Sequence, residues 1–277
     1  MRQLRIYSKN AYYQRLVVLK TNRYKRHRYG AFFVEGVRSI NQAVACGWGI
    51  EALVYAPDQP LSGWATDLLH TDAADAHYLL AADLMEELSG KTDTSELIAI
   101  VRMRADDLTA LSLSSNPLLA LFDRPSNHGN LGTVLRSCDA LGVEGLLITG
   151  HATDLYDPEV IAASMGSFFR VPALRAADPE ALTAFLAGLR AEYPGFQMVG
   201  TTAHRETDIA HVDLTRPTLM MIGNETDGLA RGFKEACDVL ATIPMDASSS
   251  ATSLNVGCAA TVLFYEAARQ RRTACAF

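Results

Sequence analysis

Continuous apolar runs alternate with amphipathic stretches through the second half of this chain, and this alternation limits its fold more than any other feature. The runs cover 118–122, 145–149, 197–201, 218–223 and 239–244. The stretches between them include 131–141, 179–193 and 229–238, and a long closing helix is expected over about 253–271. Strands that are apolar on both faces and separated by helices are typical of a parallel sheet with helices on each side. The pattern predicts an α/β fold.

The first hundred residues predict a separate, smaller α/β unit. Strands are expected at 31–34, 52–55 and 97–101, and helices at 15–20, 39–46, 64–69 and 82–88. Residues 106–117 are rich in Ser, Leu and Asp, a composition that favours a linker. We therefore expect a first domain over 1–105, a linker over 106–117 and a second domain over 118–277.

Composition and cysteine spacing argue against membrane and disulfide-bonded proteins. The 277 residues contain no uncharged apolar run of the roughly 18 residues that a membrane span needs. The N-terminal residues are polar and basic, unlike a secretory signal. The five cysteines are scattered and never form a CxxC pair; they are Cys46, Cys138, Cys237, Cys258 and Cys275. We expect reduced thiols, no metal site and a cytoplasmic protein.

Charge is divided unevenly along the chain. Residues 1–40 hold ten Lys or Arg and one acid, Glu35, which gives a net charge of +9, whereas the remainder carries −15. Tyrosines are interleaved with these basic residues, and aromatic rings beside cations suit nucleic-acid binding. The alternative is a solvated basic face. We favour RNA as the partner, with contacts from Arg23, Lys25, Arg26 and Arg28.

Three short polar clusters each follow one of the apolar runs of the second half. The first spans 127–132 and is followed by Arg136, the second is 223–225, and the third ends at 253–255. Because the carboxyl ends of parallel strands meet at one edge of a sheet, segments distant in sequence converge there. The clusters therefore predict one shared site.

Each cluster taken alone also has a plain structural explanation. Gly129 and Gly132 suit anion contact at a helix start, but they lack the full G-x-G-x-x-G spacing of a dinucleotide-binding turn. Arg136 could form a surface salt bridge, and Ser253 could be the N-cap of the last helix. The order of the three clusters and their shared position after strands favour the functional interpretation.

The clusters resemble the three motifs of the SpoU (TrmH) family of RNA ribose methyltransferases. Asn130-Leu131-Gly132 with Arg136 resembles the first motif, and Ile222-Gly223-Asn224-Glu225 with Gly228-Leu229 resembles the second. Ile243-Pro244-Met245 with Ser253-Leu254-Asn255-Val256 resembles the third, although Gly257 stands where a serine is common. The match covers roughly 116–272. The first unit more loosely resembles the family's L30e-like, ribosomal-protein-like substrate-binding domain.

The resemblance implies a SPOUT fold, a parallel sheet whose C-terminal segment forms a trefoil knot, in a homodimer. It implies S-adenosylmethionine as cofactor, bound by Thr201, Gly223, Ile243 and Leu254. Methyl transfer would go to a ribose 2′-hydroxyl, with Arg136 as the catalytic arginine. Because arginine is almost always protonated, we prefer that it pairs with a phosphate and stabilises the developing alkoxide.

The same resemblance assigns supporting roles to the other polar residues of the clusters. Asn130, Ser253 and Asn255 would orient the nucleotide, and Glu225 would hold Arg136 or the turn of the second cluster. Ribosomal RNA is the favoured substrate, because the extra N-terminal domain suits a large structured RNA. Transfer RNA, a nicotinamide-dependent enzyme and a non-catalytic RNA-binding protein are the alternatives.

Overall fold

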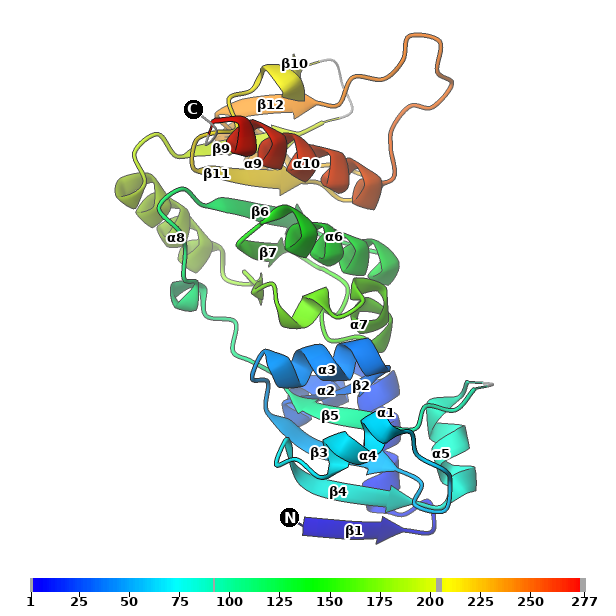
Figure 1. Cartoon of the computed structure of the whole chain (residues 1–277). Coiled ribbons are helices and arrows are strands. Elements are labelled where there is room, and N and C mark those ends of the chain that lie inside the picture. Colours follow the sequence, from blue (N-terminus) through cyan, green and yellow to red (C-terminus); the bar gives the residue numbers. More distant parts are fainter. Residues whose placement is uncertain (1, 92, 203–205, 275–277) are drawn as a thin grey trace. The chain divides into compact units, whose positions relative to one another are not determined.

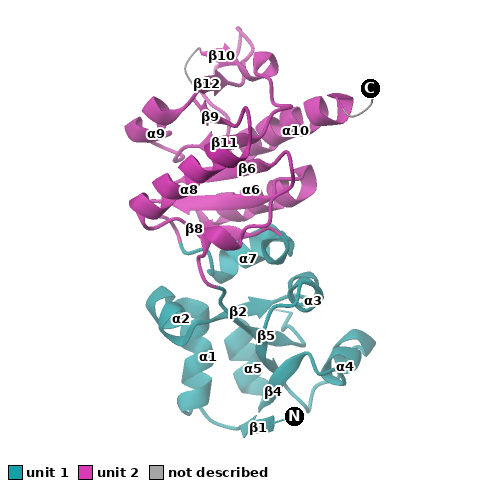
Figure 2. Ribbon diagram, turned by 90° about the vertical axis from the view of Figure 1, so that its left-hand side faces the viewer, with its two compact units in different colours: residues 1–104, 154–170 teal, residues 105–153, 171–277 magenta. Residues whose placement is uncertain are grey.

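The computed structural model describes residues 2–91, 93–202 and 206–274, so Cys275 lies outside the described residues. The chain forms two compact units (Figure 2). The first comprises 1–104 together with 154–170, and the second comprises 105–153 and 171–277. Residues 154–170 thus pack with the first unit, although the sequence places them within the second domain. The other four cysteines, Cys46, Cys138, Cys237 and Cys258, are free thiols.

The first unit is built on a mixed five-stranded sheet (Figure 1). The strand order is β1(Arg2–Ile6), β4(Ala74–Leu80), β3(Ile50–Tyr55), β5(Ile98–Arg102) and β2(Ala31–Glu35). The first three are parallel, and β5 runs antiparallel to both of its neighbours. The helices are α1(Ala11–Thr21), α2(Arg23–Tyr29), α3(Val37–Ala45), α4(Gly63–Leu69) and α5(Ala82–Ser89). The three strands and four helices expected here are confirmed to within a few residues, whereas β1, β4 and α2 were not expected.

Residues 154–170 complete the core of the first unit. They contain α7(Pro158–Ser164) and a short turn of helix at Ser167–Phe169. Phe168 and Phe169 pack against Phe32 and Trp48, with ring centroids 5.3–6.3 Å apart. Aromatic pairs in this distance range stabilise beyond the area that they bury. The segment is therefore an integral part of this unit.

An ion cluster joins the same segment to α2. Arg26 is 1 % exposed. The Nε of its guanidinium donates to Asp154 at 2.8 Å, and a terminal nitrogen of the same group donates to Asp157 at 2.8 Å. A charge this deeply buried requires such partners. Arg26 is therefore unavailable to a phosphate, and its assignment as an RNA contact is corrected.

The second unit contains the predicted parallel sheet, and all seven of its strands run the same way. Their order is β10(Thr207–Asp208), β12(Val239–Thr242), β9(Gln197–Thr201), β11(Thr218–Ile222), β6(Leu118–Asp123), β7(Gly145–Thr149) and β8(Ala173–Arg175). Each of the five apolar runs is a strand, which confirms the α/β prediction. The chain moves outward from β6 through β7 to β8 and then returns to β9. This reversal is the kind of place where α/β sheets bind ligands.

Helices cover both faces of this sheet, as Figure 2 shows. Leucines and phenylalanines of α8(Pro179–Glu192) and α9(Arg231–Ala236) pack on one face in a single apolar core. The helices α6(His128–Leu141) and α10(Val256–Ala274) pack against each other on the opposite side. None of the described helices has the length and apolar character needed to cross a membrane. The ends of β9, β11 and β12 are left for a site.

Candidate cofactor pocket and the residues around it

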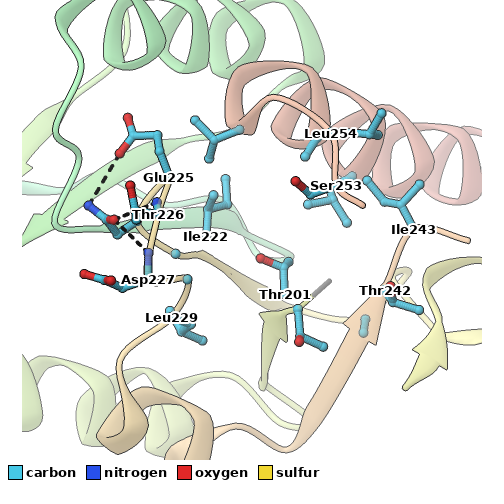
Figure 3. A pocket seen from close by; sticks show the side chains of 18 of the residues that line it. Thr201, Ile222, Glu225, Thr226, Asp227, Leu229, Thr242, Ile243, Ser253 and Leu254 are labelled. Carbon is cyan, nitrogen blue, oxygen red and sulfur yellow. Dashed lines mark hydrogen bonds between the residues drawn. The ribbon is translucent and has the colours of Figure 1, made fainter. Parts of the chain in front are cut away.

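A cavity of about 350 Å³ lies where β9, β11 and β12 end. Figure 3 shows its walls, which come from the strand ends, the loop 222–229, the segment 241–245 and the start of α10. The four residues expected to bind the cofactor, Thr201, Gly223, Ile243 and Leu254, all line it. Glu225 and Ser253 line it as well. Residues of the second and third clusters thus line one cavity, whereas no residue of the first cluster does.

The turn after β11 is closed so tightly that position 223 admits only glycine. A Cβ built on Gly223 would lie 2.1 Å from the backbone nitrogen of Leu229 and 2.2 Å from the carbonyl carbon of Gly228. Asn224 and Gly228 exchange two backbone hydrogen bonds of 3.1 and 3.0 Å. The side chain of Asn224 accepts further bonds from the amides of Thr226 and Asp227. These contacts fix the loop as a rigid wall of the cavity.

Glu225 joins the second cluster to the first. Its carboxylate accepts hydrogen bonds from the amide and hydroxyl of Ser126, at 3.1 and 2.8 Å, and from the amide of Asn127 at 3.3 Å. The Nδ2 of Asn130 donates to it at 3.2 Å. Burial alone would raise the pKa of Glu225, but the hydrogen bonds from Ser126 and Asn130 outweigh burial and lower it. Glu225 is therefore a firmly held carboxylate.

Asn255 extends this chain of hydrogen bonds to the third cluster. Its Nδ2 donates to the Oδ1 of Asn130 at 3.1 Å. Its own Oδ1 accepts from the amides of Gly257 and Cys258, at 2.9 and 3.3 Å, and so caps α10. The cap considered for Ser253 belongs to Asn255 instead. All three clusters are thus linked through side chains.

Arg136 stands apart from the cavity, on the exposed side of α6, almost two turns after Asn130. Its guanidinium forms no hydrogen bond or ion pair within the described part of the chain. The alternative of a surface salt bridge is therefore not found among the residues described. Nor does Glu225 hold Arg136, because the acid bonds to the start of α6. The guanidinium remains available to an anion.

Gly257, the departure from the usual third motif, sits where α10 comes close to α6. A Cβ at this position would lie 2.9 Å from Cγ2 of Thr133. One turn further along, the hydroxyls of Ser137 and Thr261 are 2.7 Å apart. The glycine therefore permits a close approach of the two helices.

Sequence reasoning missed a second link between strand ends and loop. Asp123 ends β6 and is 2 % exposed. It accepts hydrogen bonds from Thr149 at 3.1 Å and from the amide of Ala230 at 2.9 Å. Arg124 adopts a left-handed conformation (φ 52°) and donates to the carbonyl of Gly228 at 3.0 Å. An acid directly after an apolar run, followed by Arg and Pro, was the available signal.

The basic residues of α2 face different surroundings. Arg28 is exposed, Arg23 and Lys25 are partly exposed, and the ring of Tyr24 between them is 70 % exposed. Asn22 caps the helix by accepting from the amide of Lys25 at 3.0 Å. Three of the four expected RNA contacts therefore reach the surface of the first unit, and Arg26 does not.

Two family models together match most of this chain. The model of the SpoU rRNA Methylase family matches residues 117–265, and that of the SpoU L30e-like domain matches 10–99. A 23S rRNA (uridine(2479)-2′-O)-methyltransferase of Streptomyces viridochromogenes is 43 % identical over 268 residues, which span 96 % of this chain and 92 % of the relative.

Two solved structures resemble the chain over nearly its whole length. The SpoU methyltransferase AviRb from Streptomyces viridochromogenes, in complex with AdoMet, has a TM-score of 0.89 at 42 % identity and covers 95 % of this chain and 99 % of its own. An AdoMet-bound rRNA methyltransferase from Sinorhizobium meliloti has a TM-score of 0.81 at 25 % identity, covering 96 % and 98 %. The chain therefore belongs to the SpoU rRNA methylase family.

Proposed function

We propose that this protein transfers a methyl group from S-adenosylmethionine to a ribose 2′-hydroxyl of ribosomal RNA. The observation that carries the proposal is the cavity at the strand ends, whose wall residue Glu225 is hydrogen-bonded to Asn130 and, through it, to Asn255. The relative that is 43 % identical is named for this reaction on 23S rRNA. A position in 23S rRNA corresponding to its uridine 2479 is therefore the first target to test.

The cavity suits the cofactor because both apolar and polar side chains line it. Apolar side chains suited to an adenine ring come from Ile222, Leu229, Ile243 and Leu254, and polar groups come from Thr201, Thr242 and Ser253. The missing Cβ at Gly223 lets the loop close against Leu229. When bound, the cofactor supplies an activated methyl group on a sulfonium.

The chain's own residues would position the RNA and stabilise the negative charge that develops on the 2′-oxygen. The 2′-oxygen would lose its proton to solvent water as it takes the methyl group from the sulfonium. The guanidinium of Arg136, which has no partner among the described residues, would pair with a phosphate and stabilise the developing negative charge. Ser253 and the second Nδ2 hydrogens of Asn130 and Asn255 would orient the nucleotide. Glu225 acts on Asn130 and is a positioning residue.

The first unit would bind RNA through the exposed residues of α2. Arg23, Lys25 and Arg28 would contact phosphates, and the exposed ring of Tyr24 would stack on a base. Replacing Lys25 and Arg28 by Ala should weaken RNA binding and flatten its salt dependence, as measured by filter binding. Unchanged affinity would reject this surface as an RNA contact.

We also propose a homodimer and keep the trefoil knot as part of the proposed fold. The helix α10 leaves Val262 and Tyr265 exposed, by 40 % and 52 %, beside its contact with α6. Apolar side chains on one side of a helix suit a second copy of this chain. Tyr265→Arg should yield a monomer in light scattering. With ribosomal RNA as its substrate, the protein would act in the cytoplasm.

The test of the activity is methylation of 23S rRNA transcripts with labelled cofactor, followed by mapping of 2′-O-methyl positions. Arg136→Ala should reduce turnover by about 10²–10³-fold while cofactor affinity in calorimetry stays unchanged. Arg231→Ala, which removes an exposed guanidinium on α9, should behave like the wild type. Methylation of transfer RNA instead would change the substrate, and RNA binding without any methyl transfer would support a non-catalytic role.

A further inference from the structure

Lys234 brings a positive charge to the wall of the cofactor cavity. It belongs to α9, which follows the loop 222–229, and its side chain is partly buried. Within the described ranges, it is the sole Lys or Arg that lines the cavity. No family motif quoted above includes it, and the proposed reaction gives it no role.

The surroundings of α9 hold this lysine in place. The buried carboxylate of Asp123 accepts a hydrogen bond from the amide of Ala230, just before the helix begins. The amide of Lys234 donates to the carbonyl of Ala230 at 3.0 Å. At the far end, Cys237 packs on β9 so closely that a Cβ on Gly200 would lie 2.3 Å from its sulfur. The backbone that carries the ammonium group is thus anchored at both ends.

The acids of the cavity are engaged elsewhere. Glu225 is bonded to Ser126, Asn127 and Asn130, and Asp227 lies 3.7 Å from a guanidinium nitrogen of Arg124. Lys234 has no ion pair within the described part of the chain. A partly buried cation without an internal anion favours a ligand that carries a negative group.

We infer that Lys234 binds the carboxylate of the methionine part of S-adenosylmethionine. The inference rests on the proposed use of this cofactor. The cofactor carries two positive groups, the sulfonium and the amino group, and a single negative one, the carboxylate. Beside Glu225 and Asp227 that carboxylate would be repelled, whereas the ammonium of Lys234 offers it a charge-assisted hydrogen bond. Lys234 thus orients the amino-acid end of the cofactor.

The experiment compares two ligands that differ only in the carboxylate, S-adenosylmethionine and decarboxylated S-adenosylmethionine, by calorimetric titration. Lys234→Met keeps the aliphatic chain and removes the charge. It should weaken S-adenosylmethionine about tenfold and leave the affinity for the decarboxylated ligand unchanged. Lys234→Arg, which keeps a positive charge, should retain most of the wild-type affinity for S-adenosylmethionine. Arg231→Ala, which removes a positive charge from the same helix outside the cavity, should affect neither ligand.

Each other outcome rejects the inference in a recognisable way. An equal loss for both ligands means that Lys234 shapes the cavity without meeting the carboxylate. Unchanged affinity for S-adenosylmethionine means that the carboxylate binds elsewhere, and the proposed function then stands without this contact. If the wild type binds neither ligand, the proposed cofactor itself is wrong.

Discussion

The side chain of Glu225 holds together several residues of the site. Its carboxylate accepts from donors on Ser126, Asn127 and Asn130, all at the start of α6. The carboxylate is an acceptor at both oxygens, whereas a glutamine amide would place its own NH₂ against one of these donors. The ionised carboxylate of Glu225 therefore holds the loop after β11 against the start of α6.

Glu225→Gln should lower the free energy of unfolding by about 1 kcal/mol at pH 7, allowing for screening at this partly exposed group. The folded-state pKa of Glu225 lies below its ordinary value of 4.5. The stabilisation is therefore present above 4.5 and disappears as the pH falls through the lower, folded-state pKa. Urea unfolding of wild type and variant at a series of pH values measures this.

Glu235→Gln is the matched control, because Glu235 is an exposed acid whose ion pair among the described residues is with Arg231 on its own helix. Its effect should stay within a few tenths of a kcal/mol. A gap between wild type and Glu225→Gln that stays constant from pH 7 to below pH 4 would contradict the role given to the carboxylate.

At the level of elements, the start of α10 combines a structural and a functional contact in Asn255. The Oδ1 caps the helix and the Nδ2 donates to Asn130. Asn255→Asp keeps the cap and removes the donor, so it should unfold near the wild-type temperature but methylate more slowly. Asn255→Ala should also lose about 1 kcal/mol of stability. Thermal unfolding and single-turnover methylation separate the two effects, and equal stability of both variants would refute the cap.

Elements with a strong local pattern were predictable, and those defined by distant partners were not. Each apolar run of the second unit is a strand, because a strand that is buried on both faces has a continuous apolar sequence. The strand β1, by contrast, carries two arginines and pairs only with β4 at the sheet edge. In α6 the cap from Asn127 starts the helix at His128, three residues before the expected start.

The site was predictable in place but not in detail. Three clusters after strands were enough to expect one shared edge, because parallel strands end together. The burial of Arg26 depends on Asp154, which is 128 residues away, and no local pattern reports such a pair. Lys234 lies within the amphipathic stretch 229–238 and belongs to no motif, so only the folded chain shows that it reaches the cavity.

For the whole molecule, the first unit should require residues 154–170 to fold. A fragment of 1–105 would leave Arg26 buried without Asp154 and Asp157, at a cost of about 3–5 kcal/mol, and would expose Phe32 and Trp48. Circular dichroism during urea titration should show no cooperative transition for this fragment. The same fragment joined to 154–170 by a flexible linker should unfold cooperatively. Cooperative unfolding of 1–105 alone would contradict this dependence.

The last wall of the cavity comes from a segment late in the sequence, and this has a consequence during translation. The first unit is complete once residue 170 has been made, but the cavity still lacks the segment 252–263. A polypeptide released between these points would occupy RNA without modifying it, and would compete with the finished enzyme. On the proposed function, a nascent chain would become a catalyst only after residue 263 has been made, and a chain released earlier would act as an inhibitor.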